Sequence, residues 1–164
     1  MMTSDDAWKL LQHVYDWIKV ADTKAGALLG ASGVLGGIIV HILPKASNWA
    51  LSPWQTGLSA VSLALTGTSM VISIRVFAPR LRTQSSGSPL YFAHIATENT
   101  NGTEFKLKFD RLTSDTDEMS EALCDQIWES SRIARRKLRL VASATWLFTS
   151  ALLTASIVGI LKGF

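Results

Sequence analysis

Three long stretches without a charged residue dominate the pattern of apolar and polar positions in this chain. They are Ala25–Pro44, Trp54–Ile74 and Leu140–Leu161, which contain 20, 21 and 22 residues. An α-helix rises about 1.5 Å per residue, so about 20 apolar residues are needed to cross the hydrocarbon core of a bilayer. Each stretch is therefore predicted to be a membrane-spanning helix, and the chain is predicted to cross a membrane three times.

Nearly all charged residues lie in two parts of the chain. All 13 acidic residues and 14 of the 16 basic residues precede the first stretch or lie between the second and the third. Because Lys and Arg concentrate on the cytoplasmic side of a membrane, near the ends of the spans, this distribution predicts a cytoplasmic N-terminus and a cytoplasmic middle segment. The C-terminus is then expected on the outer, periplasmic side.

Helical periodicity extends the first and third spans beyond the bilayer. Apolar residues recur at helical spacing over residues 5–24 and run without a break into the first span. Asp115 or Thr116 is expected to cap a helix that continues from about residue 117 to Leu161. Residues 105–109 alternate between apolar and polar types, which leaves a short strand and a helical turn both open.

The predicted fold is an all-α membrane protein with three transmembrane helices and a small cytoplasmic helical head. The head is formed by the helix extensions and the 78–138 insertion. The whole chain is predicted to form one unit. Its predicted segments are a cytoplasmic helix (1–24), a first span (25–43), an outer loop (44–53), a second span (54–77), a cytoplasmic sensor region (78–138) and a third span (139–161). Roughly 100 residues outside the lipid are too few for an additional enzyme domain with a large core of its own.

Every span has a face of small residues, which is the usual surface for close association of helices in a membrane. Packing within the chain could use all of these faces, or at least one could remain for a homo-oligomer. A face lined by hydroxyl groups could instead border a water path. The first span has Gly26, Gly30, Gly33 and Gly37, the second has Ser59, Ser62, Thr66, Ser69 and Ser73, and the third has Ala142, Thr149 and Ser156.

The sequence contains no motif for catalysis, metal binding or nucleic-acid recognition. It has no phosphate-binding Gly loop, no Ser/His/Asp elbow, no His–Glu pair at metal spacing and no Cys cluster. A bilayer next to the head would also crowd a nucleic-acid duplex. We therefore expect a protein that is not an enzyme, holds no metal or cofactor and does not bind nucleic acid.

Polar and aromatic side chains of the predicted head are candidates for a ligand site. Polar groups on an apolar helix face cost free energy unless they are paired. They are either satisfied by neighbouring helices or arranged around a polar ligand, and a nucleotide would suit cations and aromatic rings held close together. The candidates are Asp22, Lys24, Arg80, Ser88, Tyr91, Phe92, Gln126, Ser130 and Lys137.

Several short motifs resemble the transmembrane effectors of bacterial Pycsar anti-phage systems. The resemblance covers nearly the whole chain and includes the order of the spans. The motifs are Trp17–Gly26, Pro79-Arg80-Leu81, Leu90–Ile95, Gln126-Ile127 and Ile133–Lys137. The residues implied by the match are Asp22, Lys24, Arg80, Phe92, Gln126 and Lys137, and their role as ligand contacts is a hypothesis.

The resemblance implies an effector of the bacterial inner membrane that senses cyclic CMP or cyclic UMP made by a companion cyclase. On sensing this messenger, such an effector disrupts the membrane, so the infected cell stops growing before phage are released. Two other functions remain open from the residues alone. One is a non-enzymatic membrane adaptor with a protein-binding head, and the other is a constitutive channel subunit that uses the Ser/Thr face.

Overall fold

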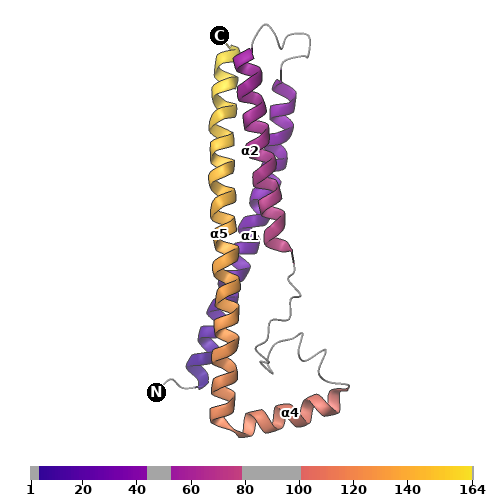
Figure 1. Cartoon of the computed structure of the whole chain (residues 1–164), viewed down its shortest axis with the longest axis vertical. Helices are drawn as coiled ribbons and strands as arrows, with labels where there is room; N and C mark the ends of the chain where they lie inside the picture. The colour runs from indigo at the N-terminus through magenta and orange to yellow at the C-terminus, as the bar shows by residue number, and fades with distance from the viewer. Residues whose placement is uncertain (1–3, 44–52, 79–100, 164) are drawn as a thin grey trace. The chain divides into compact units, whose positions relative to one another are not determined.

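A computed structural model of the chain describes residues 4–43, 53–78 and 101–163 (Figure 1). Helices account for 97% of these residues and none of them lies in a strand, which confirms the predicted all-α fold. Within this part of the chain, three helices are long and apolar enough to cross a membrane. The predicted three-span architecture is therefore confirmed.

Helix α1 (Ser4–Ile42) joins the N-terminal amphipathic segment to the first span without interruption. Asp5 and Asp6 lie in its first turn, where negative charge interacts favourably with the helix dipole. Helix α2 (Pro53–Phe77) forms the second span. It begins at a proline, a residue whose fixed φ and missing amide proton suit the first helical position.

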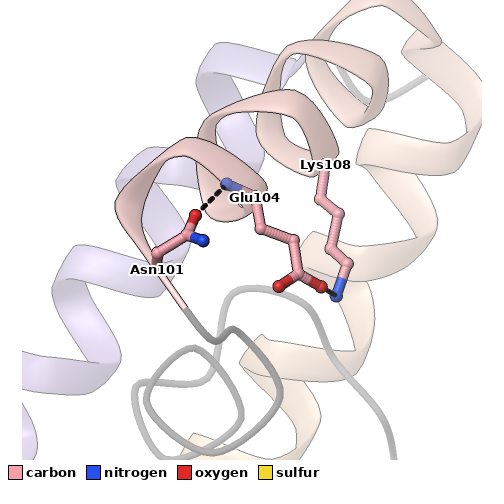
Figure 2. Close-up of polar contacts among 3 residues, drawn as sticks. All are labelled: Asn101, Glu104 and Lys108. Carbon is pink, nitrogen blue, oxygen red and sulfur yellow. Dashed lines mark hydrogen bonds and ion pairs between the residues drawn. The ribbon is translucent and has the colours of Figure 1, made fainter.

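Helix α4 (Gly102–Ser114) settles the open prediction for residues 105–109 in favour of a helix. Asn101 caps it, because its side-chain oxygen accepts a hydrogen bond from the Glu104 amide at 2.9 Å (Figure 2). Glu104 also forms an ion pair with Lys108 one turn later, at 3.0 Å. The apparent alternation contains an i, i+4 pair, Phe105 and Phe109, whose ring centroids lie 5.7 Å apart.

Helix α5 (Thr116–Gly163) contains the third span and a long N-terminal extension, as the periodicity predicts. Of the two residues expected to cap this helix, Asp115 forms the N-cap. Its Oδ1 accepts hydrogen bonds from the amides of Asp117 at 3.0 Å and Glu118 at 3.1 Å. A carboxylate at this position satisfies amides that have no partner inside the helix.

The chain divides into two compact units. Unit 1 comprises Met1–Lys19 and Pro79–Arg136, and unit 2 comprises Val20–Ala78 and Lys137–Phe164. The described core of unit 1 is small, with Ala7, Leu11 and Leu123 buried and with Met119 and Ile127 packed against them.

Unit 2 is a bundle of three helical segments, from α1, α2 and α5, which lie side by side (Figure 1). It contains two apolar clusters, both of which combine residues from different helices. One cluster consists of Ala21, Ala25, Val76 and Val141. The other consists of Leu35, Ile39, Ala151 and Ala155. Alanines at these positions allow the helices to approach closely.

Candidate functional site

Asp22 and Lys137, both candidate ligand contacts, form an ion pair with each other within unit 2. Lys137 Nζ lies 2.6 Å from Asp22 Oδ1, and the two side chains are 22% and 35% exposed, respectively. Ala21 and Val141, which are buried in an apolar cluster, lie on the same helices close by. A charged donor bonded to a charged acceptor makes one of the stronger hydrogen bonds in proteins. In this state Asp22 neutralises Lys137, so an anionic ligand would compete with the carboxylate for the ammonium group.

Lys24 lies on a different face of α1 from Asp22. Successive residues in a helix are about 100° apart, so two positions along the chain turn the side chain away from the pair. Lys24 is exposed, and within the described residues it makes no ion pair. Its charge is therefore available to a ligand or to lipid head groups.

Gln126 and Ser130 are buried on one face of α5 within unit 1, at 5% and 3% exposure. Gln126 Nε2 donates a hydrogen bond to the hydroxyl oxygen of Tyr15 on α1, at 3.2 Å. Tyr15 was absent from the sequence-based candidates because it fits the amphipathic pattern of residues 5–24. The only signal available was its spacing of seven residues from Asp22, which places both on similar faces of α1.

The remaining candidates of the head fall in the segment between α2 and α4. Arg80, Ser88, Tyr91 and Phe92 lie outside the described residues. Their roles as ligand contacts stay predictions from the sequence and from the resemblance.

The hydroxyl face of α2, which consists of Ser59, Ser62, Thr66, Ser69 and Ser73, lies in the interior of unit 2. All five residues are buried. Two of them bond across to α5, since Ser62 donates to the Ala151 carbonyl at 2.8 Å and Ser69 donates to the Ala144 carbonyl at 2.9 Å. Interhelical hydrogen bonds of this kind contribute on average about 0.6 kcal/mol each in a membrane protein.

Three buried hydroxyl groups of unit 2 lack a hydrogen-bond partner in the described part of the chain. They belong to Ser59 and Ser73 on α2 and to Ser32 on α1. Thr66, which lies between the two α2 positions, bonds to the Ser62 carbonyl of its own helix at 2.8 Å. A buried hydroxyl without a partner costs roughly 1–3 kcal/mol by mutational estimates.

Four of the five glycines of the first span lie on an uncovered face of α1. Gly26, Gly30, Gly33 and Gly37 are all exposed. A Cβ placed on any of the last three would meet nothing within 4 Å, and one on Gly26 would lie 3.7 Å from Phe77 Cζ. Within the described residues, α2 and α5 therefore pack against other positions of α1 and leave the face of Gly30, Gly33 and Gly37 open.

These observations define an α-helical membrane protein with a buried polar interface between its spans. A family model described as the Pycsar effector protein domain matches residues 6–162, and the chain belongs to this family. The family resemblance drawn from the short motifs is thereby confirmed. No curated protein and no solved structure matches the chain.

The family assignment has a direct functional consequence. It supports an anti-phage effector role and implies a cyclic nucleotide signal that is made by a companion cyclase. The match also extends over α1, α2, α4 and α5, so the three candidate spans and helix α4 belong to one domain type.

Proposed function

We propose that this protein senses cyclic CMP or cyclic UMP in a cytoplasmic head and, in response, disrupts the bacterial inner membrane. The consequence would be abortive infection, in which the cell stops growing before phage are released. The observation that carries this proposal is the family match over residues 6–162, which overlaps the three helices of the described residues that are capable of crossing a membrane.

The polar contacts of the described residues suit a switch that responds to an anion. Lys137 is held by Asp22 at 2.6 Å, and Lys24 is exposed one half-turn away on the same helix as Asp22. A cyclic mononucleotide carries one phosphate charge, which would compete with Asp22 for Lys137. Breaking this contact would change how α1 and α5 are held together in unit 2, next to the spans.

The energy required favours several copies acting together. About 5.5 kcal/mol of preference for one state is needed to move an equilibrium from mostly inactive to mostly active. One charge-assisted phosphate contact contributes only about 1.5–3 kcal/mol. Several contacts per site, or several subunits that switch together, would supply the remainder, and the open glycine face of α1 is a surface on which copies could meet.

The experiment uses purified full-length protein in liposomes loaded with a fluorescent dye. Cyclic CMP, cyclic UMP, cyclic AMP and cyclic GMP are added in turn, while thermal stability and dye release are measured. A ligand that binds only the folded state stabilises it by about 2.7 kcal/mol at 100 times its dissociation constant. Stabilisation and release with a cyclic pyrimidine nucleotide alone would support the proposal.

Two variants sharpen this experiment. Arg80→Ala is expected to weaken nucleotide binding without preventing membrane insertion. Arg111→Ala removes the same charge from an exposed position on α4 and should leave binding unchanged. A protein that responds to no nucleotide would be an adaptor, and one that releases dye without nucleotide would be a constitutive channel. Either result would overturn the proposal.

A further inference from the structure

The buried surface of α2 carries hydroxyl groups along most of its length. Every buried residue of α2 except Val76 carries a hydroxyl group. From Ser59 to Ser73 this face extends about 21 Å along the helix axis, at 1.5 Å per residue. It therefore covers most of the roughly 30 Å thickness of a hydrocarbon core.

Helix packing does not account for all of these hydroxyl groups. Among the described residues of this face, Ser62 and Ser69 bond to α5, and Thr66 bonds to its own helix. Ser59 and Ser73, which lie at the two ends of the face, are 1% and 0% exposed and have no partner in the described part of the chain. The hydroxyls at both ends are thus buried at a cost that an alanine would avoid.

A further unpaired hydroxyl approaches this face from α1. Ser32 is 1% exposed and also lacks a partner within the described residues. It lies one turn before Gly36, where an added Cβ would lie 3.8 Å from Thr66 Cγ2. Residues four apart share a face of a helix, so Ser32 belongs to the side of α1 that packs on the hydroxyl face of α2.

We propose that the hydroxyl face of α2 binds water and small hydrated ions in the activated protein, and that the described arrangement is its closed form. This inference rests on the proposed function and identifies the surface at which the membrane would be breached. In the closed form α5 and α1 cover the face. When α2 separates from them, water supplies the partners that Ser32, Ser59 and Ser73 lack. Lipid has no hydrogen-bond donors or acceptors in its core, so it would not replace water there.

The opposite side of α2 suits lipid in either state. Val61, Val71 and Ile74 are exposed apolar side chains on this side, and Val71 lies almost directly opposite the hydroxyl face by helical geometry. A charged residue is absent from the whole span Trp54–Ile74. The face would therefore admit water and ions without strong selection by charge.

The test is the accessibility of single cysteines in liposomes to a charged, membrane-impermeant thiol reagent. The single native cysteine, Cys124, is exposed and is first replaced by serine. Ser59→Cys and Ser73→Cys are then introduced separately, because neither removes a hydrogen bond found in the closed form. Val71→Cys on the opposite side is the matched control. Labelling is measured with and without cyclic CMP or cyclic UMP, in parallel with dye release.

We expect labelling at positions 59 and 73 to rise severalfold with the messenger, while labelling at position 71 stays low throughout. Dye release without increased labelling at 59 and 73 would overturn the inference and leave the proposed function intact. Full labelling at 59 and 73 before any messenger is added would overturn it as well, because the face would then be open at rest. Absence of both nucleotide binding and dye release would instead refute the proposed function. As a second readout, Ser59→Ala combined with Ser73→Ala should lower the rate of dye release at saturating nucleotide, and an unchanged release rate would contradict the inference.

Discussion

The ion pair between Asp22 and Lys137 makes a quantitative prediction about how α1 and α5 are held together in unit 2. In Asp22→Asn the side chain keeps its shape but loses its charge, so Lys137 remains 22% exposed without a counter-charge. A hydrogen bond between charged groups contributes about 1.5–3 kcal/mol when it is well desolvated, whereas an exposed pair contributes about 0–1 kcal/mol. Because this pair is partly exposed, we expect a loss of about 1–2 kcal/mol.

Thermal unfolding of the full-length protein in detergent micelles, followed by tryptophan fluorescence, measures this loss. For a chain of this size, 1 kcal/mol corresponds to a shift of about 2–4 °C in the unfolding midpoint. The control is Asp16→Asn on the same helix. Its partner Lys19 lies 3.9 Å away, and both side chains are more than half exposed. We expect the control to lose at most a few tenths of a kcal/mol, which corresponds to a midpoint shift of about 1 °C or less.

The exchanged variant, with Asp22→Lys and Lys137→Asp, separates a packing role from a ligand role. It restores opposite charges at the same two positions, so most of the lost stability should return. If Lys137 also binds the phosphate of the messenger, nucleotide binding should be weaker in this variant than in the unmodified protein. The reasoning is refuted if Asp22→Asn is as harmless as Asp16→Asn, or if the exchange recovers no stability.

Three further predictions concern the helix ends and faces. Asn101→Ala should destabilise α4 by about 1 kcal/mol through loss of its cap, visible as faster amide exchange at its first turn. Ser62→Ala combined with Ser69→Ala should lower stability by about 1 kcal/mol in thermal unfolding, and no change would show that these two bonds do not hold α2 to α5. Gly30→Leu or Gly33→Leu should not lower the stability of one copy, because nothing lies within 4 Å of the added Cβ and leucine has a higher helix propensity than glycine. The same substitutions should reduce cross-linking between copies, and unchanged cross-linking would exclude the glycine face as an interface.

The helices of this protein were predictable wherever a long periodic pattern was available. The continuity of α1 through residues 5–24 and of α5 from Asp115 onward follows from apolar residues at helical spacing and from one acidic cap. Helix α4 was ambiguous because it is short and Phe105, Leu107 and Phe109 alternate as in a strand. Only the Asn101 cap and the buried Leu112, seven residues after Phe105, identify the helical stripe.

The partners of the polar residues could not be predicted from the sequence. Asp22 and Lys137 are 115 positions apart, and their contact depends on the rotation of α1 and α5 about their axes. The sequence identified both as polar groups that need a partner, without showing that each supplies the partner of the other. Tyr15 was overlooked for the same reason, since its hydroxyl has a role only when Gln126 faces it.

The faces of small residues show a second limit of prediction from the sequence. Glycines in α1 and hydroxyl residues in α2 have the same spacing and make the same prediction of close packing. The two faces nevertheless have opposite environments, because the hydroxyl face is buried and Gly30, Gly33 and Gly37 are open. Spacing gives the position of a face on its helix, and only the rotation of that helix in the bundle decides what the face contacts.

The small polar contribution to the contact between α2 and α5 bears on how a small messenger could act. Two hydroxyl–carbonyl bonds at about 0.6 kcal/mol each contribute about 1 kcal/mol to holding this polar face closed. The hydroxyls of Ser59 and Ser73, which have no partner in the described part of the chain, would oppose closure, because water would satisfy them in the proposed open state. A single phosphate contact of about 1.5–3 kcal/mol is therefore comparable to the polar term that it must overcome in one subunit. The apolar contacts of Leu65 with the cluster that contains Ala151 and Ala155 would also have to be offset, so the proposed switch would need several phosphate contacts or several subunits that open together.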